Sequence, residues 1–147
     1  MPADPPVGAG HPGDGVFRSS VRRRRSTASS ICCARNGGGA VVNILSAASW
    51  FTYPGSSSYA VSKAPQWKFT NGIRLELRAQ ETTVTGVHVG MVDTDMTAAL
   101  DVEKIDPAEF VRIVLDGVKR GQSEIVADDL SRRAKAALAH EPSLLVP

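Results

Sequence analysis

Apolar residues along this chain gather into short runs that predict buried β-strands. One run covers residues 40–45 and follows three consecutive glycines, and another covers residues 83–89. Runs of this length, bounded by turn residues, are typical of strands in a core. Residues 123–127 predict one more strand of the same kind. The pattern therefore predicts about three strands in the last two thirds of the chain.

A helical pattern separates the second and third of these runs. Residues 107–119 carry apolar side chains roughly at helical spacing, which predicts an amphipathic helix. Asp106 is its expected N-cap, and Pro107 stands in the first turn, where proline is tolerated. Another helix is expected after the turn at residues 54–58, whose serines are candidate N-cap residues.

Residues 1–36 show no apolar periodicity and are rich in Pro, Gly, Arg and Ser, which predicts a disordered arm. Arg22 to Arg25 form a basic run, and no acidic residue occurs between residues 15 and 75. Such a run fits phosphate contacts with a nucleic acid, an acid-poor targeting segment, or a solvated arm. No nucleic-acid-binding motif accompanies it, so a solvated arm is favoured and no nucleic-acid partner is expected.

Tyr59 and Lys63 are the residues that most directly suggest chemistry. Side chains four positions apart on a helix lie on one face, so the phenol and the ammonium are expected side by side. An adjacent cation favours the phenolate form of a tyrosine and so aids proton transfer. Ser46 stands thirteen residues before Tyr59, at the end of the first predicted strand. From there its hydroxyl could hold a substrate oxygen beside the phenol.

This succession of strand, serine, turn, serine caps and Tyr-x-x-x-Lys resembles the short-chain dehydrogenase/reductase family. The likeness continues in residues 71–77, which are similar to the rest of the family's catalytic helix. Residues 90–96 are similar to the segment after its sixth strand, although Val89 stands where proline is usual. The resemblance covers roughly residues 37 to 138.

The resemblance implies an α/β fold over residues 37–147: part of a Rossmann-like, doubly wound parallel sheet with about three strands and two to three helices. It implies an NAD(P)-dependent oxidoreductase that interconverts a carbonyl and an alcohol by hydride transfer, with NAD or NADP as cofactor. The catalytic residues that it implies are Ser46, Tyr59 and Lys63, and the cofactor-binding residues are Tyr59, Lys63, Gly90, Val92 and Thr94.

In the roles that the family implies, Tyr59 is the general acid and base. Lys63 assists it and hydrogen-bonds the nicotinamide ribose, and Ser46 polarises the substrate oxygen. Gly90 and Thr94 match positions that lie against the nicotinamide.

The family's phosphate-binding loop, Thr-Gly-x-x-x-Gly-x-Gly, does not occur in this sequence. Gly8 to Gly13 match G-x-G-x-x-G, but the prolines before them exclude a strand and Pro12 removes a backbone N–H from the loop. We therefore expect a truncated form that is inactive as an isolated chain. The alternative to an oxidoreductase is a non-catalytic fragment without the phosphate-binding half. The residues that choose between NAD and NADP belong to that half, so the choice stays open.

Pro65 falls inside the helix that carries Tyr59 and Lys63. A proline in a helix interior removes one hydrogen bond and clashes with the preceding turn, at a cost of ~3 kcal/mol or more. We expect it to tilt or kink the helix near Lys63.

Composition limits the remaining function classes. No stretch approaches the ~20 apolar residues of a membrane span, so no membrane partner is expected. Cys32 and Cys33 are adjacent and have neither metal-ligand spacing nor a disulfide framework, which favours reduced thiols in a cytoplasmic chain. An incomplete parallel sheet leaves apolar surface uncovered. The partners expected are therefore a small carbonyl or alcohol substrate and, in a homo-oligomer, a second copy of the chain.

Overall fold

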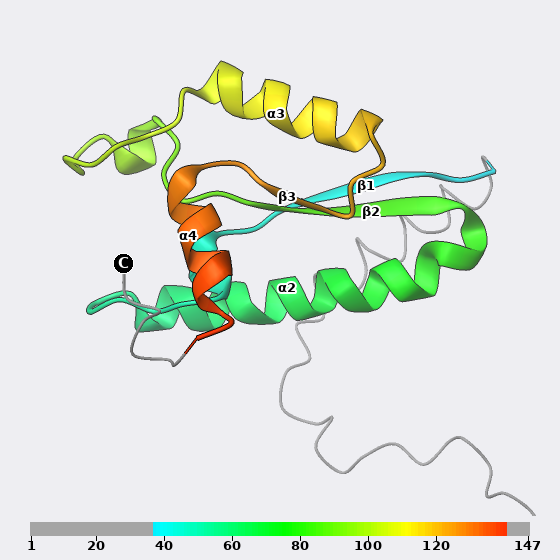
Figure 1. Cartoon of the computed structure of the whole chain (residues 1–147), viewed down its shortest axis with the longest axis horizontal. Helices are drawn as coiled ribbons and strands as arrows, with labels where there is room; N and C mark the ends of the chain where they lie inside the picture. Colours follow the sequence, from blue (N-terminus) through cyan, green and yellow to red (C-terminus); the bar gives the residue numbers. More distant parts are fainter. Residues whose placement is uncertain (1–36, 141–147) are drawn as a thin grey trace, which may run out of the picture.

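The computed structural model describes residues 37–140, which form a three-stranded parallel sheet with helices on both faces (Figure 1). The strands lie in the order β1 (Gly39–Ile44), β2 (Thr82–His88) and β3 (Glu124–Val126). Helix α2 (Ser57–Leu77) connects β1 to β2, and α3 (Pro107–Lys119) connects β2 to β3. The predicted α/β fold is confirmed, and the predicted arm lies outside the described residues. None of the helices in this part of the chain is long and apolar enough to cross a membrane.

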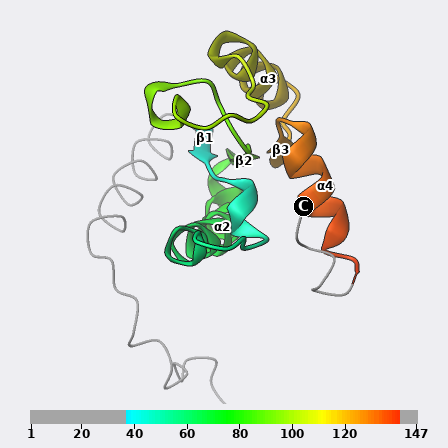
Figure 2. The same ribbon diagram turned by 90° about the vertical axis from the view of Figure 1, so that its left-hand side faces the viewer.

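The two faces of the sheet carry separate apolar clusters, because successive side chains of a strand point to opposite faces. On one face Val84 of β2 packs against Ile73 and Leu77 of α2. On the other face Val87 of β2 packs against Val114 of α3. Figure 2 shows α2 and α3 on opposite sides of the strands. Strand β2 is therefore covered on both faces.

Helix α2 runs through Pro65 as one continuous helix of 21 residues. Pro65 has no N–H for the Val61 carbonyl, so the helix lacks one internal hydrogen bond there. Two side-chain bonds fasten the following turns to the sheet. Asn43 Nδ2 of β1 donates to Thr70 Oγ1 at 3.0 Å, and Arg74 Nε donates to a carbonyl of β2 at 2.9 Å. We attribute the continuity of α2 to these bonds and to its packed apolar face.

Helix α3 has the bounds and the cap that the sequence predicts. Asp106 Oδ1 accepts from the backbone N–H groups of Ala108 and Glu109, both at 2.9 Å. Pro107 is the first residue of the helix. Gly117 faces the sheet so closely that a Cβ there would overlap the side chain of Ile125. The helix therefore lies close to β3.

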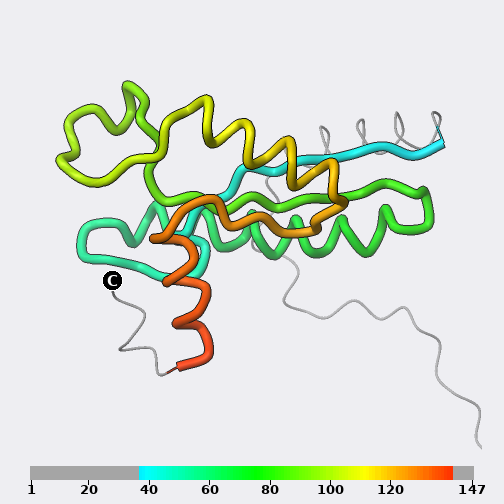
Figure 3. Tube along the Cα trace, turned by 45° about the horizontal axis from the view of Figure 1, so that its top comes forward, coloured from blue at the N-terminus to red at the C-terminus, as the bar shows by residue number. Residues whose placement is uncertain are grey.

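Helix α4 (Asp129–Ala137) follows β3, and the apolar pattern did not indicate it as a separate helix. Its Ala134 packs against Trp50 and Phe51, which lie in the segment after β1. Figure 3 shows α4 gathered with the segments that follow β1 and β2 at one end of the sheet. This packing closes the carboxyl end of the strands.

Within residues 37–140, the outer edge of β1 has no partner strand. Val41 packs toward α2, so Val42 and Ile44 point to the opposite face, where they are 38% and 48% exposed. An open edge beside exposed apolar side chains is a surface that another chain segment can cover. Pairing with a second copy stays a prediction.

Replacing Pro65 by Ala is expected to stabilise the chain. The change restores a donor for the Val61 carbonyl and removes the clash of the ring, which together cost ~3 kcal/mol. Without the proline the unfolded chain gains conformational entropy, which lowers the free energy of unfolding by ~1 kcal/mol. The expected net gain in the free energy of unfolding is therefore about 2 kcal/mol. Urea unfolding followed by circular dichroism measures it.

The matched control is Pro107→Ala. Proline at the first position of a helix leaves no bond unmade, so this variant should be unchanged or slightly less stable. An equal stability change in the two variants would contradict the explanation given for Pro65.

Candidate active site

The carboxyl ends of β1 and β2 lie side by side, and the segments that leave them carry the residues selected from the sequence. Leu45 N donates to Val87 O at 2.7 Å, and Ala47 N donates to Val89 O at 3.1 Å. The segments that follow β1 and β2 therefore stay hydrogen-bonded to each other beyond the ends of the strands. In open parallel sheets, ligands bind at the carboxyl ends of the strands.

Ser46 lies in the turn between β1 and a short 3-10 helix, η1 (Ala47–Ser49). The residue is buried, and its Oγ accepts the Ala48 N–H at 3.1 Å as the N-cap of η1. A serine hydroxyl that accepts one bond still carries a proton that it can donate. The cap therefore leaves the hydroxyl of Ser46 able to donate its proton to an oxygen at this end of the sheet.

Tyr59 and Lys63 lie in the first two turns of α2, as the sequence predicts. Lys63 Nζ is 5.5 Å from the centre of the Tyr59 ring, within the range of a cation–π contact. Tyr59 is 45% exposed, so a ligand can reach it. The structure thus places the ammonium beside the phenol ring on an accessible part of the helix.

The segment that begins at Ser46 contacts α2 through the packing of Trp50, and not through a hydrogen bond between Ser46 and Tyr59. Trp50, directly after η1, meets Trp67 of α2 edge to face, with ring centres 6.3 Å apart. The hydrogen bonds of residues 37–140 include none between the hydroxyl groups of Ser46 and Tyr59. A third oxygen would have to link the two hydroxyls if they act together.

Gly90, Val92 and Thr94 lie in the segment that leaves β2. Val92 makes an isolated parallel bridge with Ile105, which closes the loop between them. Thr94 is exposed and opens a short helix, η3 (Asp95–Thr97), with its N–H donating to a threonine hydroxyl at 3.2 Å. Gly90 therefore leaves β2 beside the Ser46 turn, and Val92 and Thr94 stand on the closed loop that follows.

Asp128 holds Gly90 in place, which the sequence did not indicate. Its Oδ2 accepts from Gly90 N at 2.7 Å, and its Oδ1 accepts from Ser131 N at 2.9 Å as the N-cap of α4. A Cβ on Gly90 would lie 2.7 Å from both Asp128 Oδ2 and Leu130 Cδ2, so a larger residue there would displace one or both side chains. An acidic residue before a helix suggests a cap, but its bond to a residue 38 positions away cannot be inferred from spacing.

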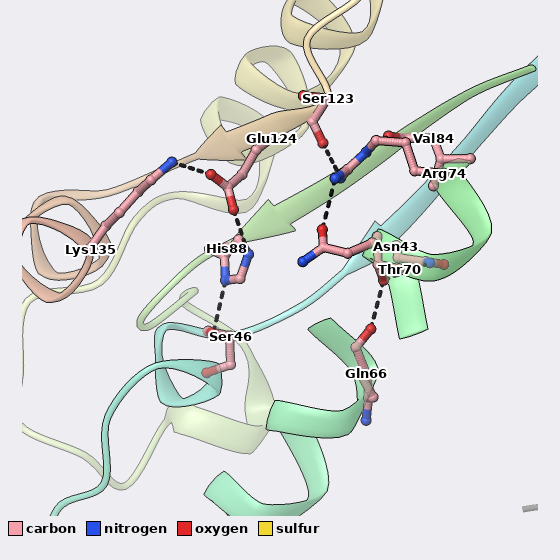
Figure 4. A network of polar contacts seen from close by, with 11 residues as sticks. Asn43, Ser46, Gln66, Thr70, Arg74, Val84, His88, Ser123, Glu124 and Lys135 are labelled. Carbon is pink, nitrogen blue, oxygen red and sulfur yellow. Dashed lines mark hydrogen bonds and ion pairs between the residues drawn. The ribbon is translucent and has the colours of Figure 1, made fainter. Parts of the chain in front are cut away.

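His88 is buried at the last position of β2 and contacts three other segments (Figure 4). Its Nδ1 is 3.1 Å from the Ser46 carbonyl oxygen, and its Nε2 is 3.5 Å from Glu124 Oε1 of β3. Its ring stacks on Trp50 with ring centres 3.7 Å apart. Lys135 of α4 forms an ion pair with the other Glu124 oxygen. These contacts could not be predicted from the sequence, because the residues that make them are far apart along the chain.

Burial lowers the pKa of His88 from its ordinary value of 6.5. The hydrogen bond with the Ser46 carbonyl and the charge of Glu124 act in the opposite direction. The positive charges of Lys135 and Arg74 add to the lowering. The imidazole of His88 is therefore neutral at neutral pH.

The side chains at this end of the sheet offer an acid/base hydroxyl, a cation and a second hydroxyl donor. These groups suit proton transfer to or from an oxygen atom. In the part of the chain that the structure describes, no group of three or more His, Cys, Asp or Glu side chains is placed to hold a metal ion.

Acidification below pH 6.5 is expected to destabilise the chain through His88. The unfolded chain takes up a proton there near this pH, whereas the folded chain takes it up only at lower pH. The free energy of unfolding should therefore fall as the pH drops from 6.5 through the folded-state pKa, by about 1.4 kcal/mol for each unit between the two pKa values. Urea unfolding midpoints over a pH series measure this dependence.

His88→Gln should remove this contribution, and His140→Gln should leave it, because His140 is exposed. An equally steep loss of stability in the His88→Gln variant would show that other groups cause it.

Comparison with known proteins identifies relatives of this chain. The family model for short chain dehydrogenases matches residues 19–104, more than half of the chain. A 3-oxoacyl-[acyl-carrier-protein] reductase of Synechocystis is 35% identical over 87 residues, which cover 59% of this chain and 33% of the relative. Sulfoacetaldehyde reductase 2 of Chromohalobacter salexigens is 40% identical over 57 residues, 39% of this chain and 23% of the relative. The chain thus spans about a third or less of the length of these curated relatives.

Solved structures give the same result. A short chain dehydrogenase from Burkholderia cenocepacia in complex with NADP superposes with a TM-score of 0.79 at 28% identity, over 86% of this chain and 55% of that one. A short-chain dehydrogenase from Sphingobium yanoikuyae in complex with NADPH superposes with a TM-score of 0.69 at 23% identity, over 82% of this chain and 50% of that one, and shows the fold alone. On the strength of the family match and of the shared fold, this chain belongs to the short-chain dehydrogenase family.

Proposed function

We propose that this chain contributes the proton-transfer side of an NAD(P)-dependent oxidoreductase site that interconverts a carbonyl and an alcohol. One observation carries the proposal: Lys63 Nζ lies 5.5 Å from the centre of the exposed Tyr59 ring. The pair stands at the start of α2, near the carboxyl end of a parallel sheet, in a chain of the short-chain dehydrogenase family.

In this proposal Tyr59 is the general acid and base. Its hydroxyl donates a proton to the substrate oxygen in reduction, and its phenolate takes one in oxidation. The ammonium of Lys63 lies beside the phenol, with Nζ 5.5 Å from the centre of its ring. Ser46 donates its hydroxyl proton to the same oxygen, because its Oγ already accepts the Ala48 N–H and is thereby oriented.

The residues present fit the nicotinamide end of the cofactor. Lys63 offers an ammonium to ribose hydroxyls, exposed Thr94 offers a hydroxyl, and half-buried Val92 offers an apolar surface. The cofactor supplies or accepts the hydride when it is bound. NAD and NADP differ in a phosphate remote from this end, so both fit. The NADP complex of the Burkholderia cenocepacia protein supports this class of cofactor.

The second candidate is a non-catalytic form of the same fold that does not hold the cofactor phosphates. One observation favours it: the strands between residues 37 and 140 are followed by no glycine-rich phosphate-binding loop.

Tyr59→Phe should reduce carbonyl reduction by at least about a hundredfold, because phenylalanine has no proton to transfer. The rate is followed as the loss of NADPH absorbance with a small ketone or aldehyde. Tyr53→Phe is the matched control, since Tyr53 is also exposed but packs near Phe51. Equal losses in the two variants would contradict the role proposed for Tyr59.

Calorimetric titration of the chain with NADPH separates the two candidates. The non-catalytic form predicts binding too weak to saturate, since most of a dinucleotide's charge is on its phosphates. Saturable micromolar binding at one cofactor per chain would exclude that form. In that case Lys63→Met should weaken binding by about tenfold, the size of a lost charged hydrogen bond. Lys68→Met should leave it unchanged, because Lys68 lies over Trp67 instead.

A further inference from the structure

We propose that His88 is a positioning residue for Ser46: the single proton of its neutral imidazole sits on Nδ1, bound to the Ser46 carbonyl, and the Lys135–Glu124 ion pair keeps it there. The role of Ser46 as the residue that holds a substrate oxygen rests on the proposed function. His88 itself touches neither substrate nor cofactor in this account.

The Ser46 carbonyl determines which nitrogen of His88 must carry the proton. The carbonyl oxygen is 3.1 Å from Nδ1, and a carbonyl can only accept a hydrogen bond. The contact is therefore favourable only when Nδ1 is the donor. The same oxygen accepts the Ser49 N–H at 2.9 Å, the bond that forms the turn of η1. The His88 bond thus acts on the peptide group that sets the direction of the Ser46 side chain.

Glu124 competes for the same proton. Its Oε1 is 3.5 Å from Nε2, and a carboxylate is a stronger acceptor than a carbonyl. If the proton moved to Nε2, the lone pair of Nδ1 would face the Ser46 carbonyl at 3.1 Å and repel it. Nε2 is buried and makes no hydrogen bond to Glu124 or to another group of residues 37–140, so no bond holds the proton on that nitrogen. The placement of Ser46 therefore depends on how strongly Glu124 attracts the proton.

Lys135 weakens this competitor. Its ammonium pairs with the Glu124 carboxylate (Figure 4). It also lies 6.0 Å from the centre of the Trp50 ring. The positive charge of Lys135 beside the carboxylate weakens the attraction of Glu124 for the imidazole proton. The charges that act on the ring are Glu124 from β3, Lys135 from α4 and Arg74 from α2. Lys135 is therefore the charge whose removal should favour the wrong tautomer.

The aromatic neighbours of His88 prevent the ring from serving both acceptors in turn. Trp50 stacks on one face at 17° between the ring planes, and Trp67 meets the ring nearly edge-on at a centre distance of 6.5 Å. A ring held in this way keeps one orientation. The proton position, rather than ring rotation, then selects between the Ser46 carbonyl and Glu124.

The first experiment reads the tautomer in the full chain by two-bond proton–nitrogen correlation spectra at slightly alkaline pH. We expect His88 Nδ1 to give the signal of a protonated nitrogen and Nε2 that of an unprotonated one. A main Nε2–H form would overturn the proposal. The measurement needs neither cofactor nor turnover, so a failure of the proposed function would not alter its result.

The second experiment repeats these spectra on Lys135→Met, which keeps the length of the side chain and removes its charge. We expect the ratio of the Nδ1–H to the Nε2–H form to fall by about two- to fivefold, the size of a partly exposed ion pair. Lys119→Met is the control, because Lys119 lies near Asp116 at the end of α3. An unchanged ratio in Lys135→Met, or an equal change in both variants, would show that Lys135 does not hold the proton.

The third experiment compares His88→Asn with His88→Gln. The amide of Asn can place an N–H where Nδ1 stands, whereas that of Gln places it near Nε2. We expect the Ser46 carbonyl carbon and the Ala47 amide to keep their chemical shifts in His88→Asn and to lose them in His88→Gln. Retention in His88→Gln and loss in His88→Asn would contradict the proposal. If neither variant folds, the tautomer of the unchanged chain still decides.

Discussion

The parallel pairing of β1 with β2 is the constraint on which the rest of this structure depends. The strands are in register from Gly39 opposite Thr82 to Ile44 opposite Val87. A slip of one residue would turn Val84 toward α3 and Val87 toward α2, so neither would meet the side chains that it packs against. The same pairing continues past the strand ends, so the turn with Ser46 and the loop with Gly90 leave the sheet at one place. A single register thus determines both the core and the candidate site.

At the carboxyl ends of the strands the apolar core gives way to a layer of polar and aromatic groups. His88 follows Val87, and both are fully buried, so the polar ring needs partners of its own. The Ser46 carbonyl and Glu124 face its nitrogens, and Trp50 covers its plane. One ring therefore ties the turn after β1 to β3, and through Lys135 to α4. The Ser46 turn is held by the whole carboxyl end of the fold rather than by β1 alone.

Local features of the structure were predictable from the sequence because they depend on neighbouring residues. The cap at Asp106 involves residues two and three positions away, and the Tyr59–Lys63 pair follows from helical spacing. Pro65 shows the limit of such local rules, since long-range bonds from Asn43 and Arg74 fasten the helix around it. The bonds of His88 and Asp128 connect distant parts of the chain. They could not be predicted, because spacing along the sequence carries no information on which strand ends become neighbours.

Residues 37–140 cover the two faces of the sheet to different extents. This difference bears on two parts of the proposed site, the Tyr59–Lys63 pair and the binding of the cofactor phosphates. On the α2 face, Val41 packs into the core and Asn43 is hydrogen-bonded to Thr70, so α2 covers this face of β1. On the α3 face, Val42 and Ile44 of β1 remain exposed.

Apolar surface of this kind favours a covering element, supplied by further strands and helices or by a second copy. Tyr59 and Lys63 lie on the covered side of the sheet, because both stand on α2. The geometry of that pair therefore does not depend on what covers the other face. Binding of the cofactor phosphates does depend on further elements of a doubly wound sheet, since the phosphates bind at a glycine-rich turn before a helix. The fold can thus keep Lys63 beside the Tyr59 ring independently of the elements that bind the cofactor phosphates.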